Sequence, residues 1–351
     1  MRSTLTVGKK TGRRKMLALA FALVGLMVFV AACGGDDDSN GGDGEALSTT
    51  LVMPCTESDP FCAAGQEAAT TLEEDGQVTL DVITGAPQDT AGITQVLERV
   101  AGEGQEVILA HSAWQDPSLD VGQSFPDVNI AYAGGGETGE NVATYDEPIY
   151  QAAYLAGMIG AGISESGTLG GLGAVDIPLC HAELEAFEEG AARIDKNIEV
   201  IDTYVGDFND VPRSRQAALG QVDQGADVLI ACGGAAANAM AEVVKQEDIS
   251  GFDYVSSIAS QAPENIVGTV TWDLAPYFER IVEDINGDTF RPGQAYDIGV
   301  AEGGVRLDLN DQYSAAEIPA DVTDEVENVQ QQIEDEEFEV PFIPEGEGKT
   351  G

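Results

Sequence analysis

Short apolar runs alternate with longer amphipathic stretches between residues 48 and 286. The apolar runs have the length of buried strands, and the amphipathic stretches repeat apolar positions at helical spacing. The predicted strands cover 48–54, 77–83, 106–112, 128–134, 167–175, 198–206, 226–234, 252–259 and 264–272. The predicted helices cover 63–75, 90–103, 147–164, 181–196, 212–224, 235–247 and 274–286. Strands and helices that alternate in this way indicate an α/β protein with parallel sheets flanked by helices.

This pattern is longer than one open sheet normally needs, so we predict two lobes with a ligand cleft between them. The N-terminal lobe is expected to comprise 48–144 plus 264–299, and the C-terminal lobe 145–263 plus 300–333. Residues 334–351 form an acidic tail rich in proline and glycine.

The N-terminus has the features of an export signal. Residues 2–15 carry six basic residues and no acid, and an unbroken apolar run follows from Met16 to Ala32. Val30-Ala31-Ala32-Cys33 resembles the lipobox of prokaryotic lipoproteins, in which the cysteine is acylated after the signal is cut. We therefore predict a lipoprotein signal at 1–32, a lipid on Cys33 and a disordered tether at 33–47. A signal anchor is the alternative, and Arg13-Arg14 loosely resembles a twin-arginine signal.

The charge of the chain is strongly negative. It has 62 acidic and 16 basic residues among 351, for a net charge of −46, and six of the basic residues precede Cys33. This balance excludes nucleic acid as a partner, because phosphate binding needs a basic patch. Self-repulsion on this scale is costly at low ionic strength and is screened by salt. We therefore expect a protein that works in a salty medium; an ordinary acidic exported protein is the alternative.

Four segments in a fixed order resemble the basic membrane protein family. They are YQAAYLAGMIGA (150–161), GGLGAVDIP (170–178), FEEGAARIDKNIEVIDTYVGDFNDVPRSRQAAL (187–219) and QVDQGADVLIACGGAAANAMAEVVKQ (221–246). These proteins are substrate-binding lipoproteins of ABC importers, typified by purine-nucleoside receptors. The resemblance implies a two-lobed fold like that of type I periplasmic binding proteins. It also implies three hinge crossovers, expected near 143–148, 260–266 and 298–302, and no catalytic step.

Two aromatic positions of the family's ligand site have counterparts in this chain. Asp59-Pro60-Phe61 resembles its first-lobe turn, and Phe208-Asn209-Asp210 resembles its second-lobe Phe-Asn-Asp turn. The resemblance implies that Phe61 and Phe208 clamp a planar ligand between the lobes. The hydrogen-bonding groups at the closing edge are then Asp59, Asn209 and Asp210, with backbone amides of Gly233 and Gly234.

Other positions depart from the family. Its acids are replaced where this chain reads Tyr132-Ala133-Gly134 and Ile258-Ala259-Ser260-Gln261, and its lysine is replaced by Trp272. Trp114 and Trp272 are expected at strand ends that face the cleft. A nucleoside is therefore in question, and a more aromatic pocket favours another planar ligand.

Four cysteines remain besides Cys33, and an even set in an exported protein indicates disulfides. Three pairings are possible, of which we favour Cys55–Cys62 and Cys180–Cys232 because each pair flanks one predicted turn or sheet edge. His181 is the only histidine near them, so no metal site is predicted.

Catalytic motifs are missing from the sequence. His111 lies at the end of a predicted strand and is a candidate for polar cleft lining, but no nucleophile motif or phosphate loop surrounds it. We predict no enzyme and no cofactor, but a monomeric receptor on the outer face of the membrane. It captures a small organic ligand for an ABC permease and its ATPase. The alternatives are a sensory binding lipoprotein and a true purine nucleoside receptor whose acids lie at other positions.

Overall fold

The computed structural model describes residues 46–255 and 258–344. The predicted signal at 1–32, Cys33 and the tether up to residue 45 lie outside the described residues. The first strand already begins at Leu47, the last position assigned to the tether.

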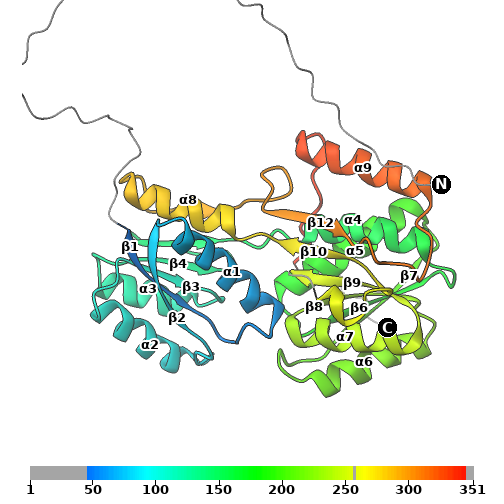
Figure 1. Cartoon of the computed structure of the whole chain (residues 1–351), viewed down its shortest axis with the longest axis horizontal. Helices are drawn as coiled ribbons and strands as arrows, with labels where there is room; N and C mark the ends of the chain where they lie inside the picture. The colour runs from blue at the N-terminus through cyan, green and yellow to red at the C-terminus, as the bar shows by residue number, and fades with distance from the viewer. Residues whose placement is uncertain (1–45, 256–257, 345–351) are drawn as a thin grey trace, which may run out of the picture. The chain divides into compact units, whose positions relative to one another are not determined.

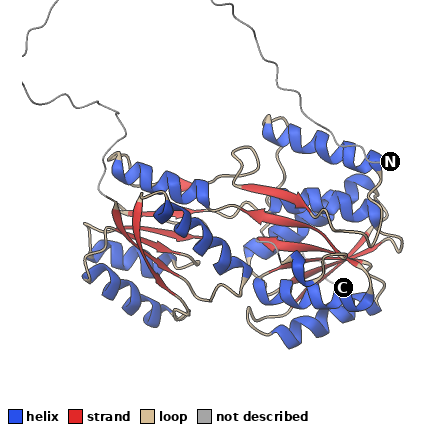
Figure 2. Ribbon diagram, in the orientation of Figure 1, coloured by secondary structure: helices blue, strands red, loops and turns tan. Residues whose placement is uncertain are grey.

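The first lobe is built on a six-stranded sheet of order β11-β5-β4-β3-β1-β2, in which all pairs are parallel (Figures 1 and 2). Its strands are β1 (Leu47–Val52), β2 (Val78–Ile83), β3 (Val107–Ala110), β4 (Asn129–Ala133), β5 (Val142–Tyr145) and β11 (Ala295–Tyr296). Its helices are α1 (Pro60–Glu74), α2 (Thr90–Gly102), α3 (Gln115–Ser124) and α8 (Ala275–Asn286). The central strand β3 is buried along its whole length, as expected for a parallel sheet covered on both faces.

The second lobe has a six-stranded sheet of order β12-β10-β9-β8-β6-β7, parallel except for the antiparallel edge strand β12. The strands are β6 (Thr168–Gly173), β7 (Glu199–Tyr204), β8 (Val228–Cys232), β9 (Ser250–Val255), β10 (Ile266–Trp272) and β12 (Val305–Leu309). The helices are α4 (Tyr150–Ile163), α5 (Pro178–Ile194), α6 (Val211–Asp223), α7 (Gly234–Glu247) and α9 (Ala320–Glu334), and η1 (Ala259–Gln261) is a 3₁₀ turn. The α/β class and the type I arrangement predicted from the sequence are confirmed.

Helices α4 and α5 cross at two glycines. A Cβ atom on Gly157 would lie 2.0 Å from the Phe187 carbonyl oxygen, and one on Gly190 would lie 1.9 Å from that of Tyr154. The two backbones are therefore in direct contact, which allows both helices to pack against one face of the second sheet.

The assignment of residues 264–272 to the N-terminal lobe is wrong. Strand β10 pairs with β9 and β12, so it belongs to the second sheet. The chain returns to the first lobe only at Asp273 and Leu274, ahead of α8, and not at 260–266. The other crossings lie between β5 and α4 and between β11 and β12. The pattern IVGTVTW identifies a buried strand, but it does not specify which sheet the strand joins.

The part of the tail that the structure describes packs on the second lobe. The Phe338 ring lies 5.4 Å from that of Tyr154, the Phe342 ring lies 5.3 Å from that of Tyr150, and Val340 is buried. Residues 345–351 lie outside the described part. Within 46–255 and 258–344, no helix is both long and apolar enough to cross a bilayer.

Candidate functional site

A cavity of about 270 Å³ is lined by residues of both lobes. The first-lobe lining comes from loops that follow the carboxyl ends of β1, β2 and β3, and Glu147 lies in the first crossing. The second-lobe lining comes from the ends of β6, β7, β8 and β9. Ligands bind at this edge of parallel sheets in open α/β folds. The lining residues are Pro54, Cys55, Asp59, Phe61, Gln88, Ser112, Ala113, Trp114, Glu147, Ile177, Leu179, Cys180, Phe208, Asn209, Cys232, Gly233, Gly234 and Tyr254.

Most of the site residues predicted from the sequence lie at this cavity. Asp59, Phe61, Trp114, Phe208, Asn209, Gly233 and Gly234 all line it. Asp210 and Trp272 do not line it. Asp210 caps the N-terminus of α6, where its Oδ1 accepts a hydrogen bond from the Arg213 amide at 2.9 Å. Trp272 is buried, because it ends a strand of the second sheet and packs among four other rings.

His111 fixes the position of Phe61 by ring stacking and by a hydrogen bond. The two rings stack at 4.1 Å with an angle of 14° between their planes, and His111 Nε2 lies 2.8 Å from the Phe61 carbonyl oxygen. His111 Nδ1 lies 3.0 Å from the Tyr145 hydroxyl. Since a carbonyl can only accept, Nε2 carries the proton and Nδ1 accepts from Tyr145. His111 therefore positions the Phe61 ring and backbone, and it does not line the cavity.

Burial keeps His111 neutral. Desolvation lowers the pKa of its imidazole from 6.5 to about 4. The ring also needs the glycine at position 65, because a Cβ atom there would lie 2.7 Å from its Cδ2. A helix that carried a side chain at this position would displace the histidine and, with it, Phe61.

Asp59 joins the two lobes at the edge of the cavity. It caps α1, with its Oδ1 accepting from the Phe61 amide at 3.0 Å. Its carboxylate also lies against the first residue of α7, since a Cβ atom on Gly234 would be 2.1 Å from Asp59 Oδ2. A carboxylate is stabilised near a helix N-terminus by the peptide dipoles. Burial raises the pKa of Asp59, and the amides of Phe61 and Cys62 partly offset that effect.

Both disulfides border the cavity. The structure joins Cys55 to Cys62 and Cys180 to Cys232, the pairing favoured from the sequence. The first bond closes the loop that carries Asp59 and Phe61. The second fixes the start of α5 to the end of β8, next to Gly233. The cross-links thus restrain the cavity wall in each lobe.

Two buried acids, one in the cavity lining and one on α5, were not predicted from the sequence as site residues. Glu147 lines the cavity and is 4% exposed, and Glu183 on α5 is fully buried. Glu147 Oε2 and both carboxylate oxygens of Glu183 have no hydrogen-bond partner among the described residues. Burial, followed by repulsion from Asp146, raises the pKa of Glu147 to about 8. Burial, followed by repulsion from Glu147, raises the pKa of Glu183 well above its ordinary value.

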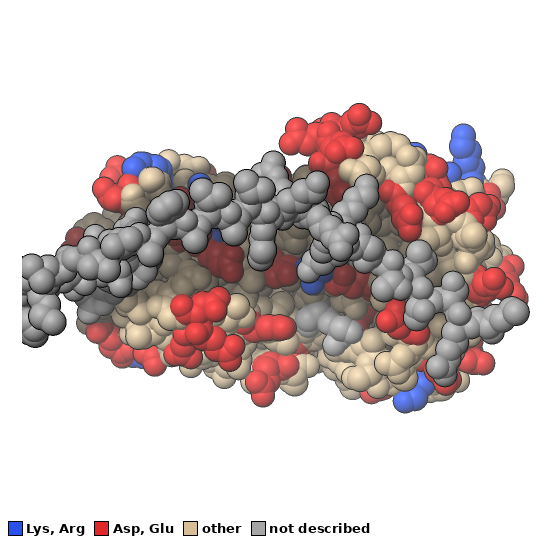
Figure 3. All heavy atoms as spheres, turned by 45° about the horizontal axis from the view of Figure 1, so that its top comes forward, with Lys and Arg blue, Asp and Glu red and all other residues tan. Residues whose placement is uncertain are grey.

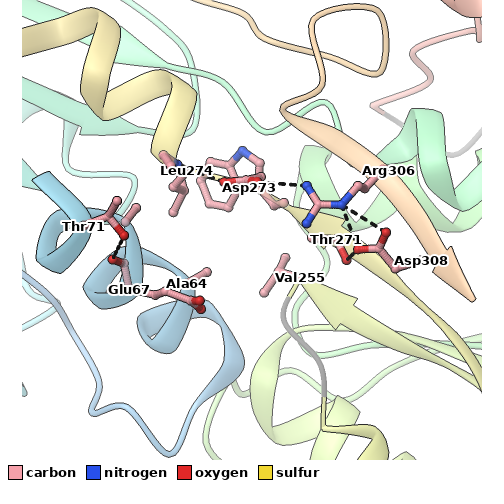
Figure 4. Close-up of a pocket in the computed structure, with 12 residues that line it drawn as sticks. Ala64, Glu67, Thr71, Val255, Thr271, Asp273, Leu274, Arg306 and Asp308 are labelled. Carbon is pink, nitrogen blue, oxygen red and sulfur yellow. Dashed lines mark hydrogen bonds and ion pairs between the residues drawn. The ribbon is translucent and has the colours of Figure 1, made fainter. Parts of the chain in front are cut away.

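A second pocket, of about 390 Å³, lies between α1 and the ends of β10 and β12 (Figure 4). Arg306 pairs with two of the three acids in its lining: Arg306 Nη1 lies 2.9 Å from Asp273 Oδ2, and Arg306 Nε lies 2.8 Å from Asp308 Oδ2. Among the described residues, its one buried lining atom without a hydrogen-bond partner is Trp272 Nε1. The cavity lined by Phe61 and Phe208 is the better candidate, because its lining comes from the carboxyl ends of strands in both sheets.

Carboxylates also cluster away from the cavity. Oxygens of Glu185, Glu188 and Asp202 lie within 4.8 Å of one another. Acidic groups cover much of the face shown in Figure 3, so such a cluster is expected from composition.

Comparison with known proteins identifies the family. The family model for ABC transporter substrate-binding proteins of the PnrA-like type, named Bmp, matches residues 52–341. The chain belongs to the Bmp family. The family assignment predicted from the sequence is thus confirmed: the chain belongs to a family of ABC transporter substrate-binding proteins.

Relatives of this Bmp protein carry names that refer to different ligands. A purine-binding protein of Brucella abortus is 26% identical over 60% of this chain and 60% of its own length. An ABC transporter glucose-binding protein of Haloferax volcanii is 26% identical over 73% of this chain and 63% of its own length. The chain thus spans less than two thirds of both relatives. Basic membrane protein B of Borrelia garinii is 23% identical over 92% of the chain and 95% of its own length.

Solved structures agree on the fold. An ABC transporter solute-binding protein of Conexibacter woesei superposes with a TM-score of 0.70 at 22% identity, covering 85% of this chain and all of that one. One from Aeropyrum pernix gives 0.72 at 21% identity, covering 84% and 94%.

Proposed function

We propose that this protein is a lipid-anchored, extracytoplasmic receptor of an ABC importer that captures a small planar organic ligand between its lobes. The observation that carries the proposal is the cavity whose lining includes Phe61 of the first lobe and Phe208 of the second. Aromatic faces bury a planar ligand efficiently and tolerate several ring systems. Glu147 of the first crossing lines the cavity, and the other lining residues come from both lobes, so hinge motion at the crossings would open and close it.

The site is suited to binding rather than to turnover. Its lining combines aromatic rings, aliphatic groups and disulfide sulfur with a few polar side chains, and His111 behind Phe61 is occupied by Phe61 and Tyr145. Asp59 against the start of α7 supplies a contact that forms only when the lobes meet. Such a contact couples closure to ligand capture, because a closed form is what a permease recognises.

The proposal of a lipid anchor is based on the sequence alone. A basic segment, an apolar run and Ala31-Ala32-Cys33 precede a Gly/Asp-rich stretch. An acyl chain on Cys33 would hold the receptor close to its permease. Mass spectrometry of the N-terminal peptide from the native host, expected to begin at a lipidated Cys33, tests this point. A mature chain that begins elsewhere would contradict it.

A thermal-shift screen in molar salt tests the proposed function. The panel contains nucleosides, free purines, other planar aromatic compounds and glucose, because relatives are named for purine and for glucose. We expect a shift with a planar compound that the Phe208→Ala variant loses and Phe342→Ala keeps, since Phe342 is exposed far along the tail. A shift that survives Phe208→Ala would refute the clamp.

A sensory role for the same binding site is the second candidate. It requires a signalling partner in place of a permease, and ligand binding alone does not separate the two. Uptake of the labelled ligand by cells with and without this gene does: uptake that does not depend on the gene would favour sensing.

A further inference from the structure

We propose that the captured ligand is a planar organic cation, whose positive group is received by the buried Glu147 carboxyl group, with Glu183 beyond it, while its ring lies between Phe61 and Phe208. This inference rests on the proposed binding function and specifies the chemistry of the same site.

The cavity is acidic without any compensating base. Its charged lining residues are Asp59 and Glu147, and the described lining includes no lysine, arginine or histidine. Asp59 already has partners in the amides at the start of α1. Glu147 has an oxygen with no partner, although it is 4% exposed. A buried carboxyl without a partner is costly in a folded protein, so it indicates a group that arrives from outside.

Glu183 interacts electrostatically with Glu147 but lies outside the cavity lining. It lies on α5 one turn beyond Leu179 and Cys180, which line the cavity, and neither of its oxygens has a partner in the described chain. Burial, followed by repulsion from Glu147, raises the pKa of Glu183, so ionisation of one carboxyl group opposes ionisation of the other. A cation bound beside them would offset this repulsion and favour the ionised form.

The aromatic walls suit the same ligand. Phe61, Trp114 and Phe208 line the cavity, and ring faces attract cations through their quadrupole. An anionic ligand, such as a nucleotide, would face only acids here. The combination of aromatic faces and unpaired carboxyls therefore selects a flat ring with a positive or protonated nitrogen group.

Binding of such a cation is coupled to proton release. In the free protein Glu147 holds a proton at neutral pH, because burial and Asp146 raise its pKa to about 8. The other titratable groups around it are Tyr145, Glu183, Tyr254 and Asp59, and none supplies a positive charge. A bound cation would favour the ionised carboxylate, and the proton would leave to solvent.

Three molecules of one shape and different charge test the inference. They are benzamidine, which is cationic at neutral pH, benzamide, which is neutral, and benzoate, which is anionic. Calorimetry in molar salt is expected to show benzamidine binding about tenfold or more tightly than benzamide, and benzoate not at all. Benzamidine affinity should rise from pH 6 to pH 8 with release of a proton.

Variants connect this preference to the two acids. Glu147→Gln and Glu183→Gln keep the shape of the side chain and remove its ability to ionise, and each should reduce the preference for benzamidine over benzamide. Glu98→Gln, an exposed carboxylate on α2, is the matched control. Equal or tighter binding of benzamide, or a preference unchanged in both variants, would overturn the inference but leave the binding function intact. If none of the three molecules and no compound of the earlier panel binds, both proposals are wrong.

Discussion

The buried Glu147 should make the protein lose stability as the pH rises. Its carboxyl has an ordinary pKa of 4.5 and a pKa of about 8 in the folded chain, raised by burial and by Asp146. Between these values the folded protein holds a proton that the unfolded chain has released. Raising the pH therefore favours unfolding, by about 5 kcal/mol over the whole interval.

The window from pH 6.5 to pH 8.5 isolates this effect from that of His111. The imidazole has a pKa of about 4 in the folded chain and an ordinary pKa of 6.5. Its protonation in the unfolded chain therefore lowers the stability of the folded protein mainly below pH 6.5. Across the chosen window the Glu147 effect amounts to about 2 kcal/mol, because most of the interval lies at lower pH. Burial raises the pKa of Asp253 to about 7, so Asp253 also lowers the stability as the pH rises. This contribution is the same in the wild type and in each variant, so it cancels when their stabilities are compared.

Urea unfolding in molar NaCl at several pH values measures the effect. The stability of Glu147→Gln relative to the wild type should increase by about 2 kcal/mol from pH 6.5 to pH 8.5, because the amide does not titrate. The control is again Glu98→Gln, which removes one exposed charge. If the wild-type and Glu147→Gln curves run parallel across the window, Glu147 is ionised in the folded protein and the reasoning is wrong.

Three further predictions concern closure, cross-linking and salt. Gly234→Ala should weaken ligand binding without unfolding the protein, since its Cβ would lie 2.1 Å from Asp59 Oδ2; unchanged affinity by calorimetry would show that the lobes close without this contact. Replacing both Cys180 and Cys232 by serine should cost about 4 kcal/mol of unfolding free energy in the chain-entropy model, because their bond spans 52 residues, and denaturant unfolding checks this. The melting temperature should rise between low and molar NaCl as the net charge of −46 is screened; a flat response would contradict adaptation to salt.

Local patterns identified most of the elements. All nine predicted strands and all seven predicted helices exist, with ends that differ by a few residues. The missed strands β5, β11 and β12 are short or lie at or next to a sheet edge, and their periodicity is weak. Helices α3 and α9 were missed. In α9, Val322, Val326, Val329 and Ile333 repeat at helical spacing, so a closer reading of that segment would have found it. Only tertiary pairing could show that β10 belongs to the second sheet.

The site residues that lie in turns after strands were predictable from the sequence. Asp59, Phe61, Phe208 and the glycines at the start of α7 follow strands, and parallel strands bring such turns to one edge. The acids Glu147 and Glu183 were not predictable, because one lies in a crossing and the other on a helix whose three other acids are exposed or half-buried. The burial of these two side chains depends on how the lobes and α5 pack together, and no local sequence pattern predicts that packing.

A crystal structure of the protein with a compound that shifts its melting temperature tests the central claim most directly. We expect the ligand in the cavity between the lobes, with its ring in contact with both Phe61 and Phe208. A ligand bound in the pocket beside Arg306, or one that touches only one of the two phenylalanines, would contradict the account.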